Sequence, residues 1–222
     1  VIFMSGLPDL YFWGEMGSAP RSALIEASDN NFYGVTYCGP MGPNDSMAEE
    51  GLGCRMDSAG AAAPVGFIFY FSSGALEAVD GNVYVTTSGR IPSNGRFWGS
   101  VMRFDPSPEP DSGMRGERLH YFQTDSPEGT PTSALVQGSD GDLYGTTDNA
   151  VYRMDTSGNV TFLVSGLHIW GPEEPESALL EVPTPEGGAR FYGVSNLGGW
   201  GVNPSGSAYG AVGTLYEMDS SG

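Results

Sequence analysis

The sequence contains no lysine, and its nine basic residues are all arginine. Against 27 Asp and Glu residues, they leave a formal net charge of −18 over 222 residues. Nucleic-acid backbones and anionic membranes are bound by clusters of Lys and Arg, so we expect neither as a partner. A saline habitat or carboxylate-bound divalent cations would each account for this acidity, and composition does not separate the two.

Long apolar runs and cysteines are also scarce. No run approaches the roughly 20 apolar residues of a membrane helix, so we expect a protein that does not span a membrane. The two cysteines, Cys38 and Cys54, flank a loop rich in Gly and Pro. Because strand ends on either side of a hairpin loop lie close together, we predict a disulfide between them and an oxidising compartment. Two reduced thiols are the alternative.

The sequence does contain a fourfold repeat, which is the strongest indication of its fold. One block begins at Ser22, Ser73, Ser133 and Ser177 and includes a Glu or Gln, a turn and a Tyr. A second block, of the type Arg-Met-Asp, follows each copy and ends at Asp57, Asp105, Asp155 and Asp219. Each unit holds short runs rich in β-branched and aromatic residues, bounded by Gly, Pro, Asp and Ser, which predict four β-strands.

Four strands in a unit of about 50 residues are the signature of a β-propeller blade. We therefore predict an all-β fold: a single β-propeller domain over residues 1–222, with four blades of four antiparallel strands. The repeats are anchored at 22–71, 73–122, 133–164 and 177–222. Residues 1–5 match the fourth strand of a blade, so we expect this N-terminal strand to pair with the last blade and close the ring. A fragment of a larger propeller is the alternative.

The third copy of the repeat is similar to a known family. Residues 135–147 read Leu-Val-Gln-Gly-Ser-Asp-Gly-Asp-Leu-Tyr-Gly-Thr-Thr. This run resembles the unit of the Gloeo/Verruco-type tandem-repeat β-propellers (choice-of-anchor tandem repeat proteins), and residues 24–36, 75–87 and 179–195 match it more weakly. The resemblance implies an extracellular, cell-surface or periplasmic protein with no established catalytic residues. A looser similarity extends to propellers of the gluconolactonase and NHL type.

The long connections of such a propeller fall on one face, which makes that face the expected binding surface. All four tryptophans of the chain lie in these connections, and tyrosines join them. Trp and Tyr dominate recognition sites and stack on sugar rings, so we predict ligand contacts there. The candidate residues are Trp98, Trp200, Trp13, Trp170, Tyr37 and Tyr209. Trp13 and Trp170 occupy equivalent positions, for which packing between blades is the alternative role.

Glu26, Glu77, Gln137 and Glu181 occupy one repeat position on the inner strands. A ring of three carboxylates and one amide around a central channel could hold Ca²⁺, with Glu26, Glu77 and Glu181 as the charged ligands. Solvated strand ends are the alternative. No other cofactor is indicated.

Catalytic motifs are scarce. His120 and His168 have no repeated partner, and the sequence has no His-Glu-x-x-His motif or phosphate loop. Glu173, Glu174 and Glu176 are the carboxylates on the long-loop face from which a glycoside-hydrolysing pair would come, and a solvated cluster is the alternative.

We therefore expect a non-catalytic extracellular or cell-surface interaction module that binds a protein or a glycan through the face with the long loops. The alternatives are a Ca²⁺-dependent carbohydrate-active enzyme, acting as a polysaccharide lyase or hydrolase, and a structural subunit of a surface filament.

Overall fold

The computed structural model of the protein describes residues 18–20, 23–38, 50–69, 71–90, 97–106, 116–123, 128–165, 173–175, 177–197, 200–202, 208–210 and 213–222. Every regular element within these ranges is a β-strand, and every strand pairing is antiparallel. The all-β fold that the repeats predicted is therefore confirmed. No helix with the length and apolar character needed to cross a membrane occurs in these ranges.

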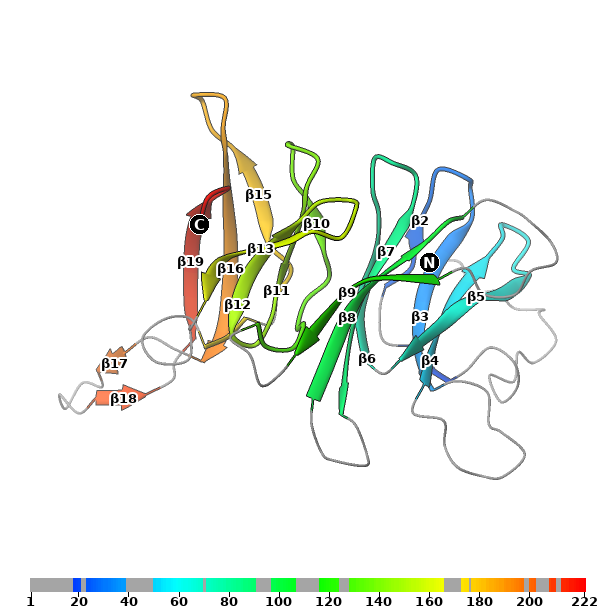
Figure 1. Cartoon of the computed structure of the whole chain (residues 1–222), viewed down its shortest axis with the longest axis horizontal. Helices are drawn as coiled ribbons and strands as arrows, with labels where there is room; N and C mark the ends of the chain where they lie inside the picture. The colour runs from blue at the N-terminus through cyan, green and yellow to red at the C-terminus, as the bar shows by residue number, and fades with distance from the viewer. Residues whose placement is uncertain are drawn as a thin grey trace.

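Four sheets follow one another in the order of the four repeats (Figure 1). The first sheet contains β1 (Ser18–Pro20), β2 (Ile25–Glu26), β3 (Phe32–Cys38), β4 (Glu50–Met56) and β5 (Ala62–Phe69). The second contains β6 (Phe71–Glu77), β7 (Val83–Arg90), β8 (Phe97–Phe104) and β9 (Gly116–Gln123). The third contains β10 (Val136–Gln137), β11 (Leu143–Thr146), β12 (Ala150–Met154) and β13 (Val160–Ser165). The fourth contains β14 (Glu173–Pro175), β15 (Leu180–Pro183), β16 (Ala189–Leu197) and β19 (Thr214–Asp219).

Within the described residues, the four sheets form an open row (Figure 1). The first and fourth sheets lie at opposite ends of the row, and the N-terminal and C-terminal parts of the described chain lie far apart with them (Figure 1). Within the described ranges, β19 pairs with β16 alone. The strand at residues 1–5 that we expected to close the ring lies outside the described residues, so ring closure and a four-bladed propeller stay predictions.

The β6–β7 and β10–β11 turns are built by the aspartate and glycine that the repeat places there, whereas Asn30 takes the place of the glycine in the β2–β3 turn. In the β6–β7 turn, the N–H of Gly81 donates to the Ala78 carbonyl at 2.9 Å, with Gly81 in the left-handed region at φ 79°. The Asp80 side chain accepts the N–H of Asn82 and the hydroxyl of Tyr84. The aspartates of the Arg-Met-Asp block likewise accept N–H groups in the turn that follows, as seen at Asp57, Asp155 and Asp219. The repeated aspartates therefore have a structural role in these turns.

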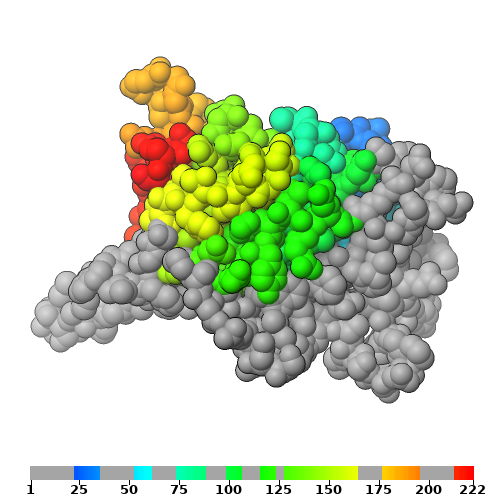
Figure 2. Space-filling view, viewed as in Figure 1, coloured from blue at the N-terminus to red at the C-terminus, as the bar shows by residue number. Residues whose placement is uncertain are grey.

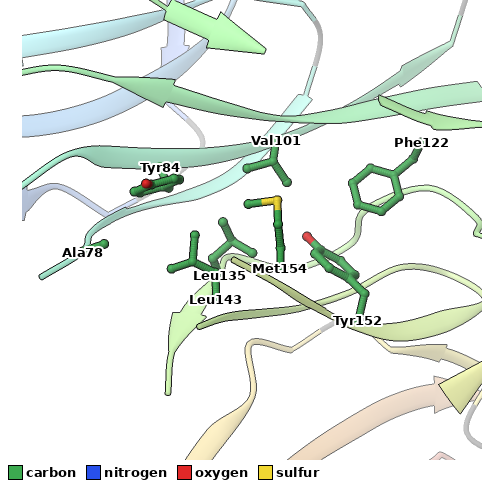
Figure 3. Close-up of a cluster of buried hydrophobic side chains, with 8 residues drawn as sticks. All are labelled: Ala78, Tyr84, Val101, Phe122, Leu135, Leu143, Tyr152 and Met154. Atoms are coloured by element: carbon green, nitrogen blue, oxygen red, sulfur yellow. The ribbon is translucent and has the colours of Figure 1, made fainter. Parts of the chain in front are cut away.

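Three apolar cores lie between consecutive sheets. The first joins Tyr33 and Val35 to Val83 and Phe104 of the second sheet. The third joins the third sheet to the fourth, where the rings of Tyr144 and Phe191 stack with centroids 4.1 Å apart. Figure 3 shows the central core, to which the second sheet contributes Ala78, Tyr84, Val101 and Phe122, and the third contributes Leu135, Leu143, Tyr152 and Met154. Each inner sheet is therefore held by apolar side chains on both of its faces.

The strand register corrects the predicted disulfide. Thr36 of β3 lies opposite Leu52 of β4. Cys38 lies two residues beyond Thr36 toward the loop, whereas Cys54 lies two residues beyond Leu52 away from the loop. Their backbones are therefore four rungs apart, about 13 Å along the ladder. A disulfide needs Cα atoms within about 7 Å of each other. Cys54 accordingly carries a thiol and forms no disulfide.

Candidate interaction surface

The row of sheets has two unlike edges, which we call the turn edge and the loop edge. The turn edge carries the short hairpin turns at residues 27–31, 78–82, 138–142 and 184–188. The loop edge is the opposite one, where β7 ends, β8 begins and the ribbon of β17 (Trp200–Val202) and β18 (Ala208–Gly210) projects from the row (Figure 1). The asymmetry that the sequence indicated is present in part, because the β5–β6 and β11–β12 connections on the loop edge are short and the β8–β9 connection on the turn edge spans residues 105–115.

The predicted aromatic residues lie at strand ends on the loop edge where they are described. Trp98 is the second residue of β8 and is paired with Gly89 and Gln123. Tyr37 is the penultimate residue of β3. Trp13 and Trp170 lie outside the described residues. The expected ligand role of all these residues stays a prediction.

Trp200 and Tyr209 are brought together by an element that sequence reasoning missed. β17 and β18 form a two-stranded ribbon in which Trp200 pairs with Gly210 and Gly201 pairs with Tyr209. The backbones of the two aromatic residues therefore lie on neighbouring rungs. The connection 196–213 looked like a plain loop because it is rich in Gly and Ser, although Trp-Gly-Val and Ala-Tyr-Gly flanking a turn-rich run was an available hairpin signal.

Three of the four inner-strand Glu and Gln residues, Glu77, Gln137 and Glu181, bind between sheets on the turn edge. The Glu77 carboxylate of the second sheet accepts the N–H and the hydroxyl of Ser28 in the first sheet at 2.9 and 2.6 Å. Glu181 of the fourth sheet binds Ser139 of the third in the same way, at 2.9 and 2.7 Å. Gln137 accepts the Val79 N–H at 2.8 Å. We call these three contacts the latches, since each ties a sheet to the hairpin turn of the sheet before it.

The latches give the repeated Glu and Gln position a role in joining sheets, which differs from the predicted role as calcium ligands. Glu77 and Glu181 reach sideways to different turns, so their carboxylates do not converge on one point with that of Glu26. Within the residues that the structure describes, no group of three or more His, Cys, Asp or Glu side chains is arranged to hold a metal ion. The position recurs because every latch needs an acceptor there.

A compact structure at the loop edge joins the second and third sheets. The N–H of Thr130, in the segment between β9 and β10, donates to the Asp148 carboxylate at 2.7 Å, and the Asp148 N–H donates to the Thr130 carbonyl at 2.9 Å. Gly129 adopts φ 72°, and a Cβ there would collide with the Asp148 carboxylate. This part of the loop edge is therefore a packed platform.

His120 is the titratable group of this platform that stands out. Its side chain on β9 is mostly buried, its ring contacts Phe122 edge-on, and its Nε2 lies 4.0 Å from the Glu128 carboxylate without a hydrogen bond. Burial lowers the pKa of His120, and the neighbouring Glu128 opposes that shift. His120 lies in the second repeat but has no matching histidine in the other copies, and Glu128 lies between two repeats, which is why sequence reasoning gave them no role.

Comparison with known proteins adds little to this geometry. No family model and no curated protein was found to match the chain. Among solved structures, the chain is similar to a crystal structure provisionally assigned as a gluconolactonase, with a TM-score of 0.44 and 15% sequence identity. The similarity covers 77% of this chain and 53% of that one, so the chain spans about half of its length. A similarity this distant carries no argument about activity.

Proposed function

We propose that the protein is a non-catalytic interaction module of the cell surface or extracellular space, which binds a protein or a glycan through its loop edge. The observation that carries the proposal is the difference between the two edges. The turn edge is occupied by short turns and latches, whereas the loop edge presents strand ends with aromatic residues and a projecting ribbon. Binding residues are commonly placed on such connections of a rigid scaffold.

The described hydroxyl groups support a scaffold role. The buried hydroxyl of Thr86 donates to the Ser133 carbonyl of the next sheet at 2.8 Å, and the Thr146 hydroxyl donates to the Ser133 hydroxyl at 2.7 Å. The Thr86 hydroxyl thus ties the second sheet to the third, and the Thr146 hydroxyl ties β11 to the segment before β10 within the third. The surface location and the relationship to the Gloeo/Verruco-type propellers are parts of the same proposal and rest on the repeat motif.

A glycan array and a protein pull-down from a surface extract test the proposal. Trp98→Ala and Trp200→Ala should each weaken capture about tenfold or more, because truncating an aromatic anchor typically costs over 1 kcal/mol of binding. Val79→Ser on the turn edge is the control and should leave capture unchanged. Equal capture by all variants would contradict the proposal. Release of product from an acidic polysaccharide, lost in Glu173→Gln, would instead favour an enzyme.

A further inference from the structure

The outer face of the fourth sheet exposes apolar side chains at positions that are buried or partly buried in the other three. Leu215 has the repeat position of Val101 and Val151, which both lie in inter-sheet cores. Val194 has the position of Val35, and Val182 that of Ala27 and Ala78. The exposed fractions on this face are 63% for Leu180, 39% for Val182, 47% for Val194 and 72% for Leu215.

Strand pairing shows that these side chains form one patch. Leu180 lies opposite Tyr192, and Val194 lies opposite Leu215. Because alternate residues of a strand point to the same side, Val182 joins Leu180, and Val194 joins Tyr192, on one face. The opposite face of this sheet carries Leu179, Phe191 and Met218, which are packed against the third sheet. We call the exposed side the trailing face.

The other end of the row carries the matching half of an inter-sheet contact. In each later sheet, one face packs against the preceding sheet. In the first sheet, the side chains of that same face are exposed or only partly buried. Leu24 is 55% exposed here, whereas its counterparts Leu135 and Leu179 are buried. Phe32 and Met56 are only partly buried, although the equivalent Leu143 and Met154 are fully buried. We call this side the leading face.

The two ends of the row each carry half of a latch position, the acceptor at the leading face and the turn at the trailing face. Each latch uses the N–H two residues after the Glu or Gln position, at Ser28, Val79 and Ser139. In the fourth sheet that residue is Pro183, which has no N–H. Glu26 of the leading face would therefore find no amide donor on the trailing face.

A guanidinium lies near the position of the missing amide. Arg190 lies opposite Val182, next to Pro183, and has the repeat position of Asn31, Asn82 and Asp142. It is half exposed and lies 3.4 Å from the Glu217 carboxylate. An approaching Glu26 carboxylate would thus meet a cation at the place where the internal latches offer an N–H, and a charged donor makes the stronger hydrogen bond.

We infer that the trailing face of one copy of this chain binds the leading face of a second copy, head to tail. The contact continues the inter-sheet packing already present three times in the row, with a Glu26–Arg190 ion pair in place of the amide latch. In the structure the two faces lie at opposite ends of the row, so a second copy supplies the partner (Figure 1). Such a contact gives a ring where its rotation closes and a filament where it does not. It uses a different surface from the loop edge and does not depend on the proposed function.

Light scattering on a sizing column, over a range of protein concentrations, tests the inference. The unmodified chain should associate as concentration rises. Leu215→Asp on the trailing face and Leu24→Asp on the leading face should each weaken association by about tenfold or more, which is about 1.4 kcal/mol or more. Val79→Asp is the matched control: its side chain is 87% exposed but lies in the β6–β7 turn, away from both faces. Circular dichroism and the melting temperature verify that each variant is folded.

Mixing the two face variants gives the sharpest result. Each retains one intact face, so an equimolar mixture of Leu24→Asp and Leu215→Asp should recover a species of two chains that grows no further. The charge pair offers a second route, since Glu26→Arg and Arg190→Glu should each weaken association and the double variant should restore it. A chain that stays monomeric at every concentration, an equal loss in Val79→Asp, or a mixture that fails to associate would overturn the inference.

Discussion

The Glu181 carboxylate of the fourth sheet accepts hydrogen bonds from both the backbone N–H and the hydroxyl of Ser139, in the hairpin turn of the third sheet. One side chain thereby satisfies two donors of a turn that belongs to a different sheet. Beneath it, the Tyr144 and Phe191 rings stack across the same interface. The polar latch therefore fixes how the two sheets are aligned while the apolar core supplies most of the contact.

Removing this latch should lower stability modestly. We expect Glu181→Ala to reduce the free energy of unfolding by about 1 kcal/mol, the typical net contribution of an intramolecular hydrogen bond. Glu181→Gln should lose less, because the native Gln137 accepts the equivalent N–H of Val79 with its amide oxygen. Urea denaturation of the three proteins measures both differences. A Gln variant as unstable as the Ala variant would show that the carboxylate charge, rather than the acceptor, matters.

Tyr84 should make stability fall at alkaline pH. Burial, with a hydrogen bond to Asp80 as the next cause, raises the pKa of Tyr84 from its ordinary value of 10.0 to about 12. The folded state therefore favours the protonated phenol, and this contribution is complete below pH 10 and is lost as pH rises from 10 to 12. The stability difference between the native protein and Tyr84→Phe should accordingly shrink across that window. A difference that stays constant from pH 9 to 12 would contradict it.

His120 should act in the opposite pH range. Its pKa is lowered below the ordinary value of 6.5 by burial, so the folded state favours the neutral ring. Stability from this residue is complete above pH 6.5 and is lost as pH falls through 6.5 toward the lower folded-state pKa. His120→Gln should therefore be less sensitive to mild acid than the native protein. Chemical denaturation at several pH values measures this, and identical pH profiles would exclude His120 as a source of acid sensitivity.

The two cysteines should react as thiols. The register of β3 and β4 separates Cys38 and Cys54 by four rungs, too far for a disulfide. Unfolded protein prepared without reductant should take up two equivalents of a thiol reagent, and a reductant should leave the melting temperature unchanged. Uptake of no reagent before reduction would indicate a disulfide and a different pairing of these strands.

Gly99 should tolerate no side chain. A Cβ at this position of β8 would collide with the Pro131 ring and the Thr87 carbonyl. Because the Thr87 carbonyl belongs to the backbone of the neighbouring strand, it cannot easily move away. Gly99→Ala should therefore lower the free energy of unfolding by about 1–3 kcal/mol, as overpacking of a dense core does. Gly81→Ala is an informative comparison, because a Cβ there meets nothing and only the φ of 79° is unfavourable. A Gly99→Ala protein as stable as the native one would contradict the close packing of this platform.

The parts of the fold that depend on local sequence could be predicted. The strands and the Asp-Gly turns follow from residues such as Asp80 and Gly81, whose conformations are set by their immediate neighbours. The latches could not be predicted, because recurrence shows that Glu77 and Glu181 share a position but not whether they face a channel or a neighbouring turn. The disulfide prediction was wrong because β4 begins at Glu50, inside the segment that appeared to be loop, which shifts Cys54 along the ladder.

The shared inter-sheet cores also determine how the protein should come apart. Each core involves only two consecutive sheets, so the free energy of the row is close to a sum of nearest-neighbour terms, as in linear repeat proteins. A sheet at the end of the row has one such neighbour and an inner sheet has two. Amide hydrogens of β7, β8, β11 and β12 should therefore exchange with solvent most slowly, while the end sheets fray first. Binding at both end faces would abolish that gradient by giving each end sheet its second neighbour.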